Sequence, residues 1–251
     1  MIKYDFHVHT NFCDGANTPE EMVRQAISQN LESIGLVCHA FTRFDQRYCI
    51  KPENVQVFVD EVTRLKEVYK DKIKVFCGVE YDFYSTINRT KFDFIIGSVH
   101  YIQKDGEFFE IDESKLDLLT AVKEKYNGDV YALIEDYYEN VSKLCEYITP
   151  NFIAHFDLIS KFNKDGELFD ENNERYVNAW KKAVDALIEY NAVFEINTGA
   201  ISRGYKDTPY PSESQIEYIK SKGGNFMLGS DAHSIYGIAY KFDEYEKYIE
   251  E

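Results

Sequence analysis

The 251-residue sequence has no apolar run close to the ~20 residues that a membrane-spanning helix needs, and its first ten residues lack the features of a secretion signal. Positive charge is also scarce, because 28 Lys and Arg residues face 44 Asp and Glu residues, giving a net charge of −16 at pH 7. A surface this acidic repels nucleic acid and anionic lipid. We therefore expect a cytoplasmic protein with neither a membrane nor a nucleic acid as partner.

Cysteine is too sparse and too irregularly spaced for a disulfide framework. The five cysteines are odd in number and include no C-x-x-C pair, which is typical of reduced thiols in a cytoplasm. We interpret Cys13 and Cys38 as packing residues, since buried free cysteine is common. Low-complexity segments, proline-rich linkers and clear internal repeats are also lacking, and we expect a single domain over residues 1–251.

What the sequence does contain is a repeated alternation of a short β-rich run and a longer helical run. The predicted strands span residues 2–8, 33–39, 74–83, 92–102, 152–158, 192–199 and 225–233. The predicted helices span residues 18–30, 51–71, 129–148, 171–190 and 211–223. This alternation predicts parallel strands joined by crossover helices, an α/β fold. No G-x-G-x-x-G follows the first strand, which disfavours a dinucleotide-binding sheet and favours a seven-stranded barrel.

All six histidines lie in or at the ends of these predicted strands, and none lies in a predicted helix. His7 and His9 share one face of the first strand, because side chains at i and i+2 point the same way. Active sites of α/β barrels form where the strands end and the loops leave. Three acids accompany the histidines at that edge. The nine candidate metal ligands are His7, His9, Asp14, His39, Glu80, His100, His155, Asp231 and His233.

Nine nitrogen and oxygen ligands exceed what one metal ion can use, since an ion takes three or four protein groups and leaves room for water. The count therefore predicts two to three divalent transition metals. A mixed imidazole and carboxylate set without thiolate suits zinc, iron or manganese. Three such ions would outweigh the charges of Asp14, Glu80 and Asp231, so the pocket would attract an anion. Closely spaced metals suit phosphoryl displacement, and a small phosphate ester is the expected substrate.

The ordered motifs HVHTNFCDG, VCHA, GVEYDF, GSVH, AHFD and GSDAH resemble those of the polymerase-and-histidinol-phosphatase (PHP) family over nearly the whole chain. Within that family, the stretches FDFIIGSVHYI, HFDLISKFN and EINTGAISRGYKDTPYPS are similar to metal-dependent histidinol-phosphatases of bacteria. The resemblance implies a distorted (β/α)₇ barrel that resembles a TIM barrel. It also implies hydrolysis of L-histidinol phosphate in histidine biosynthesis, by a metal-bridging hydroxide that attacks phosphorus.

The resemblance also implies a role for each site residue. One ion would be bound by His7, His9, Glu80 and Asp231, a second by Glu80, His100 and His155, and a third by Asp14, His39 and His233. The candidate catalytic residues are Glu80, Asp231 and His233. Arg203 is the first candidate for the substrate phosphate, because arginine binds phosphate in a fork geometry, and Lys161 is the second. The segment YIQKDGEFFEIDES after His100 contains no motif for the rest of the substrate.

Three alternatives remain open from the sequence. The first is a PHP-type protein tyrosine phosphatase or another small-molecule phosphoesterase. The second is a hydrolase of the amidohydrolase kind, which typically has a bridging lysine on its fourth strand, whereas FDFIIGSVHYI has none. The third is a non-enzymatic module like those in larger polymerases, which the complete set of nine candidate ligands disfavours.

Overall fold

A seven-stranded parallel sheet forms the centre of the computed structural model, which describes residues 2–249. Its strands are β1 (Tyr4–His9), β2 (Ser33–Val37), β3 (Lys74–Asp82), β4 (Phe94–Ser98), β7 (Phe152–Ile153), β8 (Val193–Asn197) and β9 (Asn225–Gly229). The strands lie side by side in chain order. Successive β/α units with right-handed crossovers produce this order, and they bring all carboxyl ends to one edge.

The two outer strands of the sheet meet at this carboxyl edge and close a distorted barrel. Val8 in β1 forms a parallel bridge with Ala232, which follows β9. The amide of His9 donates to the carbonyl of Ala232 at 2.9 Å, and the amide of Ala232 donates to the carbonyl of His7 at 3.1 Å. The prediction of a distorted seven-stranded (β/α) barrel is therefore confirmed.

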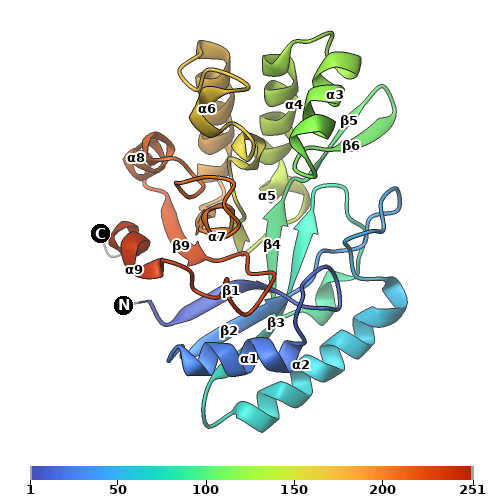
Figure 1. The fold of residues 1–251 in the computed structure, drawn as a ribbon, viewed down its shortest axis with the longest axis vertical. Helices are drawn as coiled ribbons and strands as arrows, with labels where there is room; N and C mark the ends of the chain where they lie inside the picture. Colours follow the sequence, from blue (N-terminus) through green and yellow to red (C-terminus); the bar gives the residue numbers. More distant parts are fainter. Residues whose placement is uncertain (1, 250–251) are drawn as a thin grey trace.

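Helices cover the outside of this barrel. The longer ones are α1 (Pro19–Ser28), α2 (Val55–Tyr69), α3 (Lys115–Lys125), α4 (Val130–Ser142), α6 (Glu174–Ile188) and α8 (Glu213–Ser221), and the shorter ones are α5 (Leu144–Tyr147), α7 (Gly199–Ser202) and α9 (Phe242–Tyr245). Figure 1 shows α1 and α2 on one side of the strands and α3, α4 and α6 on the other. The start of α1 follows directly from its sequence, because Thr18 and Glu21 form a capping box and Pro19 occupies the first turn.

The region between β4 and α4 differs from the sequence-based assignment. The single strand predicted over residues 92–102 is wrong, because β4 ends at Ser98 and the chain then forms a separate antiparallel hairpin. The hairpin consists of β5 (Tyr101–Lys104) and β6 (Glu107–Glu110). Its turn residues Asp105 and Gly106 both have positive φ, as an Asp-Gly hairpin turn requires. Helix α3 is an element that the sequence analysis missed.

A bulge in β1 sets which side chains enter the barrel. The pairing of β1 with β2 shifts by one residue between Asp5 and Val8. Phe6 consequently packs inside the barrel, with its ring 5.6 Å from that of Phe94. His7 also points inward, with Nε2 3.4 Å from Oε2 of Glu80. Adjacent residues of a regular strand would face opposite sides, so the bulge allows one strand to supply both an apolar plug and a polar site.

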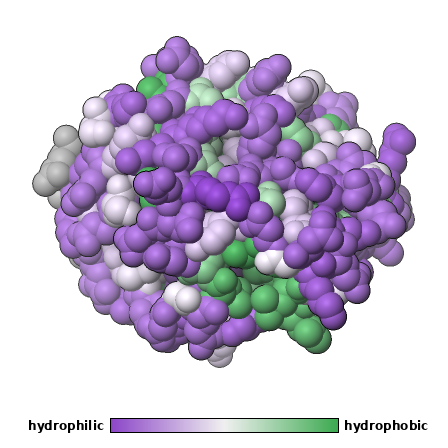
Figure 2. All heavy atoms as spheres, turned by 90° about the horizontal axis from the view of Figure 1, so that it is seen from above, coloured by the Kyte–Doolittle hydropathy of each residue, from purple (hydrophilic) through white to green (hydrophobic). Residues whose placement is uncertain are grey.

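The surface matches the acidic, hydrophilic composition. Polar residues cover most of the face shown in Figure 2, and the apolar residues gather in one area of it. No helix within residues 2–249 combines the length and the apolar character needed to cross a bilayer. All five cysteines are free, so the prediction of unpaired thiols is confirmed.

Candidate active site

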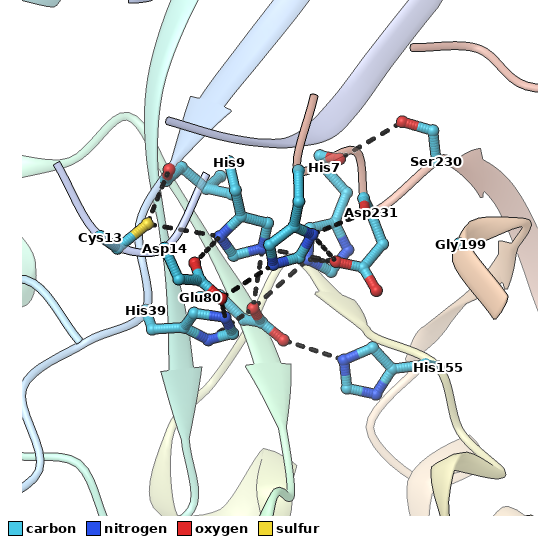
Figure 3. A network of polar contacts seen from close by, with 12 residues as sticks. His7, His9, Cys13, Asp14, His39, Glu80, His155, Gly199, Ser230 and Asp231 are labelled. Atoms are coloured by element: carbon cyan, nitrogen blue, oxygen red, sulfur yellow. Dashed lines mark hydrogen bonds and ion pairs between the residues drawn. The ribbon is translucent and has the colours of Figure 1, made fainter. Parts of the chain in front are cut away.

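The structure gathers all nine predicted metal ligands at the carboxyl edge of the barrel, and Figure 3 labels all of them except His100 and His233. Within each of four sets, the potential ligand atoms lie within 4.8 Å of one another. The sets are His7, His9 and Asp231; His9, Asp14, His39 and His233; His7, Glu80 and His155; and His39, Glu80 and His100. Every strand of the sheet except β8 contributes, near its carboxyl end or in the loop that follows, as in other α/β barrels.

Glu80 occupies the centre of the cluster and faces histidines with both carboxylate oxygens. Its Oε2 lies 3.2 Å from Nε2 of His9 and 3.0 Å from Nδ1 of His39. Its Oε1 lies 2.9 Å from Nε2 of His155 and 3.4 Å from Nε2 of His100. The two oxygens therefore address two different groups of imidazoles, which is the arrangement that a bridging carboxylate needs.

Several polar atoms of the cluster are buried without a hydrogen-bond partner. These atoms are Nε2 of His7, Nε2 of His9, Nδ1 of His155 and Oε2 of Glu80. Buried polar atoms without partners are costly and therefore rare in folded proteins. Unpartnered imidazole nitrogens beside an unpartnered carboxylate oxygen are the donor set expected where divalent cations bind, so the residues present fit the predicted metals.

The acids of the cluster are ionised. Burial opposes ionisation of Glu80, yet the neighbouring His39 and His100 hold its pKa well below the usual range. Burial likewise opposes ionisation of Asp231, but the Arg203 guanidinium and His7 hold its pKa well below the usual range. Carboxylates that stay charged in a buried site are available as metal ligands at neutral pH.

Arg203 and Lys161 line a pocket of about 290 Å³ together with six of the nine candidate ligands. Arg203 donates from Nη1 to the carbonyl of Asp231 and from Nη2 to Oδ2 of Asp231, both at 2.8 Å. Gly199 permits this packing, because a Cβ there would lie 2.9 Å from Oδ2 of Asp231. Lys161 instead donates from Nζ to the carbonyl of Asp112 at 2.6 Å, with Oδ2 of the same residue 3.2 Å away. Both predicted cations thus reach the pocket, but the charge of Lys161 is largely compensated there.

Glu195 in β8 is a site residue that the sequence analysis missed. Its Oε1 lies 2.7 Å from Nδ1 of His7, and its Oε2 accepts from the amide of His155 at 3.0 Å. Gly229 in β9 makes room for this carboxylate, because a Cβ there would lie 1.8 Å from Oε1. A carboxylate that holds the second nitrogen of a metal-ligating histidine fixes its orientation and raises its basicity. The sequence feature that could have revealed Glu195 is its position as the one acid inside the apolar run AVFEIN.

Replacing Glu195 by Gln is expected to lower the metal affinity by about 10- to 100-fold, because His7 loses the carboxylate that orients its ring. Competition with a graded chelator would measure the affinity, and circular dichroism would confirm that the fold persists. Glu189→Gln, which changes an exposed carboxylate after α6, is the matched control. Equal metal affinities in the two variants would contradict an orienting role for Glu195.

Two further residues, Asp82 and Cys13, contact candidate metal ligands. The Oδ2 of Asp82 accepts from the amide of His100 at 2.7 Å. The sulfur of Cys13 lies 3.5 Å from Nδ1 of His9, so this thiol contacts a candidate ligand in addition to filling space. Cys38 is buried beside Thr10, in keeping with its interpretation as a packing residue.

Known sequences similar to this chain are described as histidinol-phosphatases or probable histidinol-phosphatases. A histidinol-phosphatase of Lactococcus lactis subsp. lactis is 29% identical over 248 residues, which cover 93% of this chain and 85% of the relative. A probable histidinol-phosphatase of Schizosaccharomyces pombe is 26% identical over 267 residues, which cover 97% of this chain and 85% of the relative. The similarity therefore extends over almost the whole barrel rather than over the ligand motifs alone.

Solved structures share the fold. A candidate histidinol phosphatase of Listeria monocytogenes matches with a TM-score of 0.82 at 20% identity, covering 97% of this chain and all of the other. A histidinol phosphate phosphatase of Lactococcus lactis, solved with zinc, L-histidinol and phosphate, matches with a TM-score of 0.68 at 21% identity, covering 98% and 92%. The family model of the PHP domain matches residues 5–199, from the first histidine strand to the first residue of α7. Since this match covers most of the sequence, the chain belongs to the PHP domain family.

Proposed function

We propose that this protein is a metal-dependent phosphomonoesterase that hydrolyses L-histidinol phosphate to L-histidinol and phosphate. The observation that carries the proposal is the cluster of nine imidazole and carboxylate ligands that opens into a pocket with an arginine. The relatives that match almost the whole chain are named histidinol-phosphatases, which supports this substrate. The partner is thus a small phosphorylated molecule, and the free cysteines fit a reducing cytoplasm.

The metals would be held as the family resemblance implies. The proposed ligands are His7, His9, Glu80 and Asp231 for one ion, Glu80, His100 and His155 for a second, and Asp14, His39 and His233 for a third. Bound divalent ions would supply an activated water and would neutralise the charge that develops on the phosphoryl oxygens. The two oxygens of Glu80 keep the first two ligand groups together.

The remaining chemistry falls to side chains of the pocket. Nη1 and Nη2 of Arg203 each bond Asp231, and the guanidinium N–H groups that these bonds leave over can hold phosphoryl oxygens. The leaving alkoxide has a high pKa and needs a proton. Asp231, the neighbouring His233, whose Nδ1 lies 3.5 Å from Oδ1 of Asp231, or an activated water would supply it.

The proposal predicts a metal-dependent activity with a clear substrate preference. After removal of metal with a chelator and reloading with zinc, manganese or iron, phosphate release from L-histidinol phosphate is expected to return from background to full rate. A phosphotyrosine peptide is the competing substrate, because a tyrosine phosphatase of the same family is the main alternative. A higher kcat/KM on the peptide, or no release from L-histidinol phosphate by reloaded protein, would overturn the proposal.

A further inference from the structure

The pocket has an acidic wall in addition to its metal-ligand wall. Glu110, Asp112 and Glu113 line the same 290 Å³ space as Arg203 and the candidate ligands. Hereafter these three carboxylates are called the acidic wall. None of them belongs to the sets that could hold a metal within the described residues. These carboxylates would repel a phosphate dianion. Their presence in the pocket therefore needs a separate explanation.

The β5–β6 hairpin fixes the position of this wall relative to the metals. The hairpin leaves directly after His100 and returns antiparallel to itself, pairing Tyr101 with Glu110. The next residue, Ile111, donates its amide to the carbonyl of His100 at 3.0 Å and is buried. The acidic wall is therefore attached by backbone to a candidate metal ligand, within the reach of one small substrate.

Asp112 has a buried oxygen that no group among residues 2–249 satisfies. Its Oδ1 is buried without a hydrogen-bond partner, whereas Oδ2 faces Nζ of Lys161 at 3.2 Å. Burial opposes ionisation of Asp112, but the charges of Lys161, His100 and His155 hold its pKa below the ordinary value. A buried, charged carboxylate oxygen without a donor is costly. A donor from a bound molecule would remove that cost.

Glu110 adds negative charge that the protein only partly balances. One of its oxygens lies 2.8 Å from Nη2 of Arg47, but the same guanidinium also binds Asp45 at 2.6 Å. Burial and the nearby Asp112 raise the pKa of Glu110 to about 7. Glu113 accepts a hydrogen bond from the hydroxyl of Tyr48, and its Oε1 lies 3.9 Å from Nη1 of the same Arg47, so one guanidinium faces three carboxylates. The wall as a whole thus favours a cationic ligand group.

We infer that Asp112, assisted by Glu110, binds an ammonium group located two carbons from the phosphate ester oxygen, and so selects phosphate esters of amino alcohols. The inference rests on the proposed function, because L-histidinol phosphate carries its ammonium group at that position. The phosphate then faces the metal ligands and Arg203, while the ammonium group lies against the carboxylates of Asp112 and Glu110 across the pocket.

Two isosteric substrates test this selection without using histidinol. Phosphoethanolamine carries the ammonium group, and propyl phosphate carries a methyl group in its place. The metal-loaded wild type is expected to prefer phosphoethanolamine in kcat/KM by about 10- to 100-fold, the usual worth of a hydrogen bond to a charged group. Asp112→Asn is expected to abolish this preference, and, because it also frees the charge of Lys161 in the pocket, to hold or raise kcat/KM on propyl phosphate rather than lower it.

Control variants separate selection from general damage. Glu107→Gln removes an exposed carboxylate from the same strand β6 and is expected to leave the preference unchanged. Glu110→Gln is expected to reduce the preference less than Asp112→Asn, and it provides the test if Asp112→Asn does not fold. A preference retained in both variants, or an equal loss on both substrates, would overturn the inference.

The experiments distinguish a failure of the proposed function from a failure of the ammonium site. If the wild type does not hydrolyse L-histidinol phosphate but prefers phosphoethanolamine over propyl phosphate in a manner that Asp112→Asn abolishes, the substrate proposal is wrong and the ammonium site stands. If the wild type hydrolyses L-histidinol phosphate and Asp112→Asn retains the ammonium preference, the function stands and the site is wrong.

Discussion

Replacing Glu80 by Gln is expected to remove two metal ions together and to reduce kcat by about 1000-fold, because bound ions contribute several kcal/mol to phosphoryl transfer. The amide keeps the size of the side chain but loses its charge, and one of its two ends becomes a donor that cannot ligate a metal. Both ends of Glu80 matter, since Oε2 faces His9 and His39 while Oε1 faces His100 and His155.

Elemental analysis of purified protein measures this effect, alongside phosphate release from L-histidinol phosphate. Wild type is expected to carry two to three equivalents of transition metal. Glu32→Gln, which removes an exposed partner of Lys3, is the matched control and should retain metal and activity. One equivalent or less in fully active wild type, or a loss of only one ion in Glu80→Gln, would contradict a bridging role.

The candidate ligands could be predicted from the sequence because parallel strands place their carboxyl ends at one edge. The ligands lie within or a few residues after apolar runs that predict buried strands, as with His39, two residues after SIGLV, and His233, four residues after NFMLG. The side-chain period of two then explains why His7 and His9 reach the same carboxylate. Composition alone carried no such information, since six histidines are few for a chain of this length.

The supporting residues depend on tertiary structure and could not be predicted in the same way. Glu195 reaches His7 only because the barrel closes with β9 between β8 and β1, and Gly229 in β9 leaves room for the carboxylate. The bulge that turns both Phe6 and His7 inward leaves no mark in the residue pattern. The acidic wall was missed because the strand predicted over residues 92–102 covers only the first two residues of β5, and the segment after it, which contains Glu110 and Asp112, was given no element and no role.

Lys161 lies in the pocket, as predicted, but its surroundings weaken its role in phosphate binding. The sequence analysis named it as a second phosphate ligand, and the structure does place it in the pocket. Its ammonium group, however, is bound by the carbonyl and carboxylate of Asp112. A lysine whose charge is already paired attracts a phosphate less than a free one, so we propose that Lys161 mainly positions Asp112.

Arg203→Ala is expected to reduce kcat/KM on L-histidinol phosphate by about 30- to 1000-fold, because a charge-assisted bidentate contact in a partly dry site is worth roughly 2–4 kcal/mol. Lys161→Ala, in the same pocket, is expected to cost less than about tenfold because its charge is paired with Asp112. Arg203 also bonds Asp231, so metal content must be measured in Arg203→Ala.

A second variant, Arg203→Lys, restores the positive charge without the fork of guanidinium donors and is expected to recover only part of kcat/KM. Full recovery of kcat/KM in Arg203→Lys would mean that the positive charge alone, and not the fork geometry, binds the phosphate. A change below threefold in Arg203→Ala would show that the phosphate is bound without this arginine.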